Sequence, residues 1–516
     1  MMDVSKRNWM TAAGMATCAA WFGLCPRAEA QESAPKAVQP DILLIMPDQM
    51  RGDCLSLLGH PVVRTPHLDQ LAAQGTVFTR AYTTCPSCIP ARYALLTGLY
   101  PQTSGVVGFA NKPVDVPTLP ALLTEAGYST LLVGRYMHQK PQNNGYQQQI
   151  LGSTYVAGDD YDNYLKQAAP DSGGIRKLVT SKLRISYNSA SAKPWPLAEE
   201  LHPSVWIVRE SCKAVEAAEP DRPLFLTASF YAPHPPLFPP ARYFEAVKQR
   251  QLPEPAHGDW EEWSALSPAG NKAGNKAGNK AGVRILLQGA LLRDVLCGYF
   301  GLIEQLDDQL VTLVDAFKER SRKAGRPWVI VFCSDHGEML GDHGYFRKCE
   351  PYEGSARIPL IIAGSPELGF RAGQRMAQPV CLEDILPTLL DLAQGQRPAR
   401  LDGISLIPAL RGDTQKIRPW VHLEHSPYYS REQAFHALTD GRFKYIWRPV
   451  SGAEQLFDLE NDPQENHDLA RDAQAAPLLN EWRARMVQQL AGRPEGFSDG
   501  KKLIAGRPYP AIQKKP

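Results

Sequence analysis

Two cysteines three positions apart, Cys85 and Cys88, lie in the stretch TTCPSCIPARYALLTG at residues 83–98, and they admit two different chemistries. From Cys85, Cys-x-x-Cys is the spacing of a redox dithiol or of half a zinc site. From Cys88, a cysteine is followed at fixed offsets by Pro90 and Arg92, with a predicted helix behind it. Other parts of the sequence are needed to distinguish between these two interpretations.

Side chains that bind metals or move protons follow four apolar runs, directly after each run ends. The runs are DILLIM (41–46), STLLVG (129–134), LFLTASF (224–230) and WVIVFC (328–333). The residues that follow them are, in the same order, Asp48 with Gln49, Arg135 with His138, His234, and Asp335 with His336. Because ligands of an open parallel sheet bind outside the carboxyl ends of its strands, these side chains are predicted to share one site.

Four of these residues form a ligand set suited to a hard cation. Asp48, Gln49, Asp335 and His336 supply mainly oxygen with a single imidazole, which suits Ca²⁺, or alternatively Mg²⁺, better than zinc. Taken alone, Asp48 is equally typical of a cap after a strand, and Asp335-His336 of a turn. Their common position after strands favours a metal site.

The apolar runs also predict the fold class. They are short, β-branched and separated by long crossovers, as buried parallel strands are, and a fifth run, IPLIIAG, lies at 358–364. Helices are predicted at 67–75, closed by Gly75, and at 299–325, where leucines recur at helical spacing. We therefore expect an α/β fold with a doubly wound, mostly parallel sheet flanked by helices.

The 516-residue chain divides into three parts. A signal peptide is predicted at 1–30, a catalytic domain at 38–395, and a smaller C-terminal α+β subdomain with a small antiparallel sheet at 396–495. The C-terminal strands are expected to turn at Asp440-Gly441. The tandem repeat AGNKAGNKAGNKAG at 269–282 has no apolar face and is interpreted as a surface loop.

The first 30 residues predict export to the periplasm or the extracellular space. Lys6 and Arg7 precede the run TAAGMATCAAWFGL and a small-residue site at 28–30, and no stable membrane insertion is expected. The 56 basic and 54 acidic residues nearly cancel, which does not favour nucleic acid as a partner. Eight cysteines remain after the signal, too scattered for a disulfide scaffold, although one or two bridges are compatible with export.

The stretch CIPARYALLTG resembles the signature of the type I, formylglycine-dependent sulfatases of the alkaline phosphatase-like superfamily. The resemblance runs over about 41–470 and includes the motifs APHPP, SDHGEMLGDHG and RKCEPYEGSARIPLI. It implies that a formylglycine-generating maturation enzyme oxidises Cys88, the first residue of Cys-x-Pro-x-Arg, to formylglycine. It therefore favours the chemistry read from Cys88 over the redox pair.

The resemblance also implies roles for matching positions. Cys88 is the precursor of the nucleophile and also contacts the metal, and Arg92 stabilises the aldehyde hydrate. The other catalytic roles fall to His138, which accepts the proton of the second hydroxyl, His234, a candidate general acid at the ester oxygen, and Lys348, which holds the sulfate and the leaving oxygen. His234 and Lys348 are thus also substrate-binding residues.

Two positions depart from the family pattern. Where many relatives carry lysine, this chain has Arg135, which keeps the positive charge but transfers no proton at neutral pH, so we assign it substrate or hydrate contact only. Where many relatives carry two aspartates, this chain has Asp48-Gln49, which removes one negative charge from the metal site.

The sequence thus predicts an exported sulfatase that hydrolyses a sulfate monoester of a glycan or other small molecule. An alternative within the enzymes is a phosphonate monoester or phosphodiester hydrolase with the same site. A non-catalytic sulfated-glycan binder would require a degraded site, whereas nucleophile, metal set and histidines are all present. Substrate specificity is expected in the loops at about 139–200 and 235–290.

Overall fold

The computed structural model describes residues 38–137, 142–262, 266–268, 284–413 and 415–513. The predicted signal peptide, the tandem repeat and His138 lie outside these residues. In the described part of the chain, no helix is long and apolar enough to cross a membrane.

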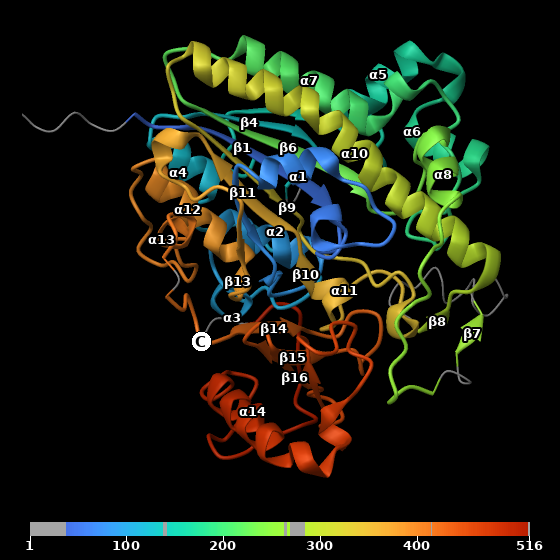
Figure 1. Ribbon diagram of the computed structural model, residues 1–516, viewed down its shortest axis with the longest axis vertical. Helices are drawn as coiled ribbons and strands as arrows, with labels where there is room; N and C mark the ends of the chain where they lie inside the picture. The colour runs from blue at the N-terminus through green and yellow to red at the C-terminus, as the bar shows by residue number, and fades with distance from the viewer. Residues whose placement is uncertain (1–37, 138–141, 263–265, 269–283, 414, 514–516) are drawn as a thin grey trace, which may run out of the picture. The chain divides into compact units, whose positions relative to one another are not determined.

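An eight-stranded sheet with the order β12-β2-β11-β9-β1-β6-β4-β5 organises the larger part of the chain (Figure 1). Its strands are β1 (Asp41–Asp48), β2 (Gly75–Phe78), β4 (Ser129–Gly134), β5 (Gln148–Leu151), β6 (Leu224–Pro233), β9 (Trp328–Cys333), β11 (Leu360–Gly364) and β12 (Gln374–Met376). The four runs expected to carry the site are β1, β4, β6 and β9. They form one contiguous parallel block, which confirms the doubly wound α/β prediction.

The fifth apolar run forms a strand of the opposite direction to the one we predicted. β11 pairs antiparallel with both β9 and β2. The connection from β9 to β11 contains no helix longer than one turn. The chain passes through the loop that carries Asp335 and His336 and then folds back beside β9. The predicted helix at 67–75 also ends early. Gly75 belongs to β2, where a Cβ would lie 2.1 Å from the carbonyl oxygen of Ile362 on β11.

Helices cover both faces of the large sheet (Figure 1). Alternate side chains of β1 pack into two separate clusters. Leu43 and Ile45 join the cluster of α1 (Pro66–Ala72), α7 (Pro203–Ala217), α8 (Ala241–Lys248) and α10 (Gly289–Lys323). Ile42, Leu44 and Met46 join that of α2 (Cys88–Thr97), α4 (Leu119–Glu125), α12 (Ile385–Leu392) and α13 (Ile407–Leu410). The strand is therefore buried on both faces, as its unbroken apolar run indicates.

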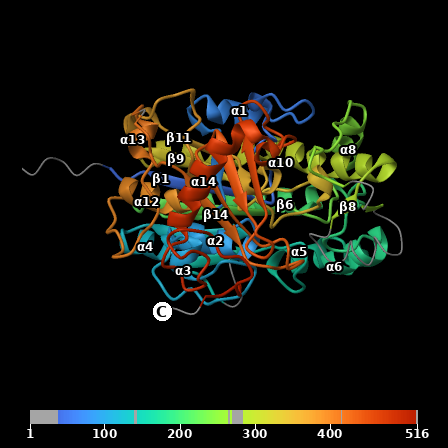
Figure 2. The same cartoon turned by 90° about the horizontal axis from the view of Figure 1, so that it is seen from below.

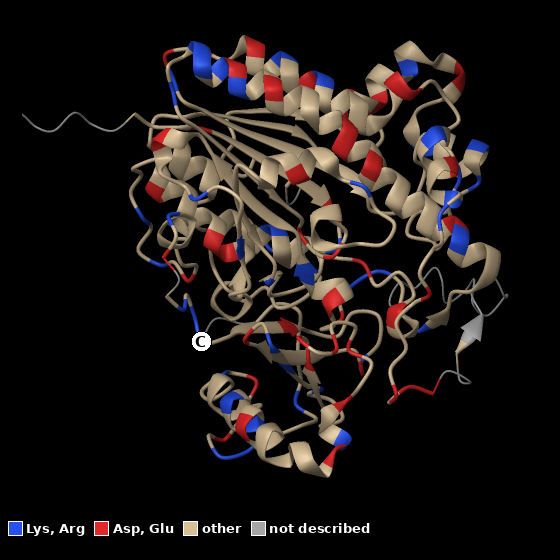
Figure 3. Ribbon diagram, in the orientation of Figure 1, with Lys and Arg blue, Asp and Glu red and all other residues tan. Residues whose placement is uncertain are grey.

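The long helix begins ten residues earlier than the predicted start at residue 299. Basic and acidic residues are mixed along it, as Figure 3 shows for α10. The remaining short helices are α3 (Pro101–Ser104), α5 (Asp160–Ala168), α6 (Ile175–Lys177) and α11 (Glu353–Ala356). A two-stranded sheet joins β7 (Ser267–Pro268) to β8 (Ile285–Leu286).

A second, four-stranded antiparallel sheet lies in the C-terminal part of the chain. It contains β14 (Val421–His425), β15 (Phe435–Thr439), β16 (Phe443–Trp447) and β17 (Glu454–Asp458), followed by α14 (Ala476–Gln489). The predicted turn at Asp440-Gly441 joins β15 to β16. One face packs on the three-stranded sheet of β10 (Arg357–Ile358), β3 (Ala81–Tyr82) and β13 (Val380–Cys381). Figure 2 views this part from below, with α14 in front.

Two buried histidines make the fold sensitive to acid. Burial lowers the pKa of His202 to about 3 and that of His425 to about 4. Because these values lie below the unfolded value near 6.5, the unfolded chain binds more protons between pH 4 and 6.5. The free energy of unfolding is therefore expected to fall as the pH drops below 6.5, by about 2 kcal/mol per histidine at pH 5.

Urea unfolding at pH 7.5 and pH 5 measures this loss. His202 caps α7 by accepting a hydrogen bond from the backbone N–H of Ser204 at 3.2 Å. His202→Asn keeps a capping acceptor but removes the titrating ring. The variant should lose about 2 kcal/mol less stability than the wild type between the two pH values. An identical loss in both proteins would contradict the assignment.

Candidate active site

The carboxyl ends of β1 and β9 and the start of α2 bring four ligand-type side chains together. Single ligand atoms of Asp48, Cys88, Asp335 and His336 all lie within 4.8 Å of one another, and all four residues are buried. Because β1 and β9 are parallel neighbours, their ends meet at one edge of the sheet. This buried Asp/Cys/His cluster could hold a metal ion.

The histidine of this cluster is oriented as a metal ligand. The Nδ1 of His336 lies 2.9 Å from the carbonyl oxygen of Gly337, so Nδ1–H donates a hydrogen bond there. The lone pair of Nε2 is left free to bind a metal ion. Nε2 lies 3.2 Å from Cys88 Sγ. Burial lowers the pKa of His336 to about 4, which keeps the ring neutral at pH 7. Two carboxylates and one neutral imidazole fit a hard divalent cation.

The two arginines of the site are paired with its carboxylates. Arg92 places Nε 2.9 Å from Asp335 Oδ2 and Nη2 3.1 Å from Asp48 Oδ2, and Arg135 forms a second ion pair with Asp48. Burial raises the pKa of Asp48 to about 6 despite these cations. Burial opposes ionisation of Asp335 as well, but His336, Arg92 and Arg135 outweigh it and lower its pKa. The predicted arginines therefore lie at the centre of the cluster.

Arg135 reaches the site because β4 ends in a tight turn. Gly134 has φ of 102°, and a Cβ there would lie 2.1 Å from the carbonyl oxygen of Ser229 on β6. The backbone N–H of Arg135 donates to that same oxygen at 2.8 Å. A side chain at position 134 would therefore separate β4 from β6 and displace Arg135.

Cys88 is the first residue of α2, and it faces a lysine. Its Sγ lies 3.1 Å from the Nζ of Lys348, which also donates to Gln49 Oε1 at 2.5 Å. Burial alone would raise the pKa of the Cys88 thiol, but Lys348 and Arg135 lower it overall. The loop of Lys348 is tied to the cysteine loop, since the Cys349 N–H donates to the Pro86 carbonyl at 3.0 Å.

Cys85 has a different environment from Cys88. It is fully buried, burial raises its pKa, and it does not line the pocket. The eight cysteines among the described residues are all free, so the structure contains neither of the bridges that export would allow.

His234 follows β6 and presents one ring nitrogen to the pocket. Its Nδ1 lies 2.6 Å from the carbonyl oxygen of Pro235, so Nδ1–H donates there and Nε2 carries no proton in the neutral ring. Burial, together with Lys348, Arg347 and Arg135, holds the pKa of His234 well below its usual range. Without a bound anion, His234 is therefore a proton acceptor.

A histidine of the small C-terminal sheet supports the cysteine loop, and no local sequence pattern marks it. The Nε2 of His425 on β14 lies 2.8 Å from the hydroxyl of Ser87, the residue before Cys88. Its Nδ1 lies 2.6 Å from the carbonyl oxygen of Ser426, which fixes Nε2 as the acceptor of the Ser87 proton. Both side chains are buried, so the contact positions the start of α2 from a distant part of the chain.

His425→Ala is expected to destabilise the protein by about 1–3 kcal/mol, because the buried Ser87 hydroxyl loses its acceptor. Turnover should fall as well, since Cys88 follows directly. A double-mutant cycle with Ser87→Ala, read by urea unfolding, measures the coupling, and Ser87→Ala should remove most of the cost of the second substitution. Strictly additive effects would show that this hydrogen bond contributes nothing.

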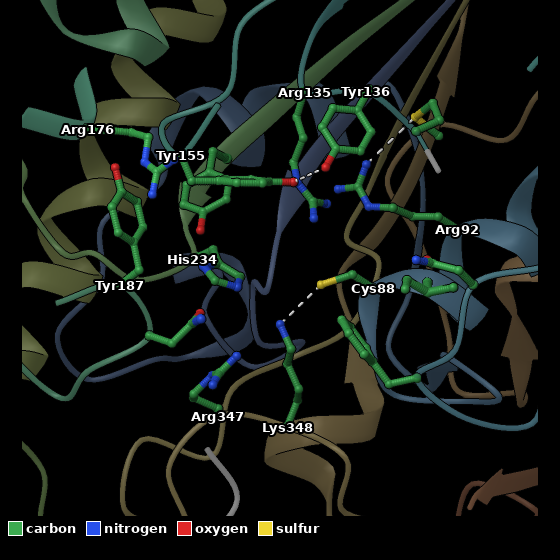
Figure 4. A pocket seen from close by; sticks show the side chains of 16 residues that line it. Cys88, Arg92, Arg135, Tyr136, Tyr155, Arg176, Tyr187, His234, Arg347 and Lys348 are labelled. Atoms are coloured by element: carbon green, nitrogen blue, oxygen red, sulfur yellow. Dashed lines mark hydrogen bonds between the residues drawn. The ribbon is translucent and has the colours of Figure 1, made fainter. Parts of the chain in front are cut away.

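A cavity of about 750 Å³ opens above Cys88 (Figure 4). Five predicted site residues line it: Cys88, Arg92, Arg135, His234 and Lys348. The predicted specificity loop at 139–200 contributes Tyr155, Arg176, Tyr187 and Asn188, and Phe109, Asn111 and Arg347 complete the outer wall. In the sequence, the only feature that marks Arg347 as a residue of this wall is its position next to Lys348.

Comparisons with known proteins agree with this geometry. The family described as Sulfatase matches residues 40–395, and the family described as N-sulphoglucosamine sulphohydrolase, C-terminal, matches residues 341–492. An arylsulfatase of Clostridium perfringens is 34% identical over 493 residues, which cover 92% of this chain and 99% of that protein. The chain belongs to the sulfatase family, and it is a sulfuric ester hydrolase.

Solved structures support the fold. The phosphonate monoester hydrolase of Agrobacterium radiobacter superposes with a TM-score of 0.71 at 24% identity, covering 91% of this chain and 100% of that one. A protein called BT4656, solved with its substrate D-glucosamine-2-N,6-O-disulfate, gives a TM-score of 0.68 at 20% identity, covering 90% and 100%. The alkaline phosphatase-like fold predicted from the sequence is thus confirmed.

Proposed function

We propose that this protein is an exported sulfatase that hydrolyses a sulfate monoester of a carbohydrate, with Cys88 converted to formylglycine by a maturation enzyme. The observation that carries the proposal is the position of Cys88 at the start of α2, with Sγ 3.1 Å from Lys348 Nζ and 3.2 Å from His336 Nε2, at the floor of a cationic cavity. The glucosamine disulfate bound by BT4656 supports a carbohydrate as the carrier of the sulfate.

The residues that would hold the cation are Asp48, Gln49, Asp335, His336 and the modified side chain at 88, and we propose Ca²⁺, with Mg²⁺ as the alternative. When bound, the cation supplies positive charge to the sulfuryl oxygens. A formylglycine hydrate at position 88 would supply one hydroxyl as the nucleophile, and loss of the proton of its second hydroxyl would expel sulfate and restore the aldehyde. The two carboxylates of the buried cluster and the neutral His336 support this assignment.

The side chains around Cys88 divide the remaining work. Lys348 neutralises charge on the sulfate and on the leaving oxygen from its position beside Cys88 Sγ. Arg92 stabilises the hydrate, and Arg135 contacts hydrate or substrate as a fixed cation. His138 would accept the proton of the second hydroxyl, an assignment that rests on the family resemblance.

His234 can act as a general acid only after substrate binds. Burial, together with Lys348, Arg347 and Arg135, depresses the pKa of His234, so Nε2 is unprotonated in the free protein. A bound sulfate ester offsets these positive charges and raises the pKa of His234 toward its usual value. The substrate anion thereby prepares the acid that protonates its own leaving oxygen.

Two matched substrates test the reaction class. A sulfate monoester and a phosphonate monoester carry the same single charge on a tetrahedral centre, so a phosphonate monoester or phosphodiester hydrolase is the alternative. We expect kcat/KM for 4-nitrophenyl sulfate to exceed that for 4-nitrophenyl phenylphosphonate. The opposite ratio would assign the protein to the alternative chemistry.

Removal of the metal should abolish turnover and lower thermal stability together. Without a cation, Asp48 and Asp335 are buried beside each other, compensated by arginines and, at Asp335, by the backbone N–H groups of Gln49 and His336. We expect dialysis against a chelator to lower Tm, and Ca²⁺ to restore both Tm and hydrolysis of 4-nitrophenyl sulfate. An unchanged Tm and full activity after dialysis, in protein shown by elemental analysis to be metal-free, would contradict a metal site.

A further inference from the structure

The cavity above Cys88 contains more positive charge than one sulfate ester requires. Its cationic lining residues are Arg92, Arg135, Arg176, Arg347 and Lys348. Among the described residues that line it, there is no aspartate or glutamate. A sulfate monoester carries a single negative charge, and its binding end at Cys88 is already faced by three of these cations.

Those three cations have partners at the floor of the cavity. Arg92 pairs with Asp48 and Asp335, and Arg135 pairs with Asp48. Lys348 contacts Gln49 Oε1 and Cys88 Sγ. These three cations belong to the sulfate end of the cavity. Arg347 and Arg176 are therefore left for a different group of the ligand.

Arg347 has no such partner. The residue is 8% exposed, and its Nε is buried without an acceptor. Its guanidinium forms no hydrogen bond or ion pair with any residue that the structure describes, and lies 5.7 Å from the centre of the Tyr429 ring. A buried guanidinium without a hydrogen-bond or ion-pair partner is costly, and a bound anion would reduce that cost.

The backbone around Arg347 holds the side chain in the cavity. Arg347 has φ of 80°, in the left-handed region, and its N–H donates to Glu338 while its carbonyl oxygen accepts from the Met339 N–H at 2.7 Å. Lys348 and Arg347, adjacent in the chain, both extend into the cavity in Figure 4, where only Lys348 is joined to Cys88.

The outer wall beyond Arg347 suits a ring that carries further polar groups. Arg176 and Tyr187 lie across the cavity, on the segment that follows α5 (Figure 4). Phe109, at the rim, packs against Tyr428 with ring centroids 4.6 Å apart, and Tyr428 is 46% exposed. Aromatic rings of this kind form platforms for the apolar face of a bound ring.

We propose that Arg347 forms a second anion subsite, so that the substrate carries a carboxylate or a second sulfate near the sulfate that is hydrolysed. The substrate class is therefore a dianionic sulfate ester, and Arg176 supports the same charge from the opposite wall. The inference rests on the proposed function only in taking the Cys88 end as the sulfate-binding end.

Binding to the Cys88→Ala protein tests the subsite without turnover. Isothermal titration calorimetry would compare phenyl sulfate, with one anionic group, against 3-sulfooxybenzoate and 1,3-phenylene bis-sulfate, each with two. We expect at least one dianion to bind at least tenfold more tightly than phenyl sulfate. Arg347→Gln, added to Cys88→Ala, should bring that preference ratio close to one.

Arg322→Gln is the matched control, because Arg322 is a surface arginine paired with Glu319 on α10, outside the cavity. It should leave the preference ratio unchanged. The two dianions distinguish a carboxylate from a second sulfate as the recognised group. The proposal would be overturned if the Cys88→Ala protein showed no preference for the dianions, or bound neither of them measurably. It would also be overturned if the preference remained after Arg347→Gln, or fell equally with Arg322→Gln.

Failure of the subsite and failure of the proposed function give different results. Turnover of phenyl sulfate by the mature protein tests the reaction at Cys88, whereas the preference ratio tests Arg347. A protein that hydrolyses phenyl sulfate but shows no preference for the dianions would retain the proposed function and lose the subsite.

Discussion

Cys88→Ala is expected to lower kcat/KM for 4-nitrophenyl sulfate by at least about 10⁴-fold, because it removes the only precursor of the proposed nucleophile. The substitution should leave the fold intact, since residue 88 begins α2 and alanine favours helix. Circular dichroism and Tm check folding, and steady-state kinetics measure the loss.

Cys85→Ala is the control for this prediction. Cys85 is buried three residues earlier, outside the cavity, with a pKa raised by burial. A protein that uses the Cys-x-x-Cys pair would lose activity with either substitution. We expect Cys85→Ala to retain turnover within about tenfold, with at most a modest loss of stability from the small cavity it leaves. Equal losses in the two variants would restore the redox interpretation.

Lys348→Met is expected to lower kcat/KM by about 10²–10³-fold, the usual cost of removing one group that stabilises transition-state charge. Its Nζ lies 3.1 Å from Cys88 Sγ, so the charge is lost at the reacting centre. Lys348→Arg should not restore the wild-type rate, because the larger planar guanidinium cannot occupy the same position between Gln49 and Cys88.

Lys323→Met controls for a general loss of positive charge. Lys323 lies at the end of α10 with its side chain 71% exposed, close to Glu319. It should show wild-type kinetics. Loss of activity in Lys323→Met comparable to that in Lys348→Met would mean that net charge, rather than the contact with Cys88, determines the rate.

The part of the site that lies at strand ends was predictable from the sequence. DILLIM, STLLVG, LFLTASF and WVIVFC form β1, β4, β6 and β9, and these strands are consecutive in the sheet. Parallel strands direct their carboxyl ends to one edge, so the residues that follow them meet without any further information. Local patterns alone therefore predicted that Asp48, Arg135, His234 and Asp335 would lie at one edge of the sheet.

The residues that support the site from other parts of the chain were not predictable in this way. His425 reaches Ser87 from the C-terminal sheet, 338 positions away, and nothing in VHLEH marks it as a partner of the cysteine loop. Arg347 looks like an ordinary surface cation until its burial and its missing acceptor are known. Such contacts depend on how one sheet packs on another, which periodicity does not encode.

The direction of β11 shows a second limit. IPLIIAG has the same unbroken apolar character as the four parallel strands, because both kinds of strand are buried on both faces. The apolar composition of a strand indicates that the strand is buried, whereas the path of the preceding connection decides its direction in the sheet. Here the connection is the site loop that carries Asp335, His336 and Lys348, and it returns the chain beside β9.

The proposed function requires that residue 88 is converted to formylglycine and acts on a sulfate ester. The most direct measurement is the mass of the tryptic peptide AYTTCPSCIPAR, residues 81–92, from active protein purified from its native host, with fragmentation to locate any change. We expect an aldehyde or its hydrate at position 88 and an unmodified cysteine at position 85. An intact thiol at Cys88, or a disulfide between Cys85 and Cys88, in a preparation that hydrolyses 4-nitrophenyl sulfate would rule out formylglycine as the nucleophile.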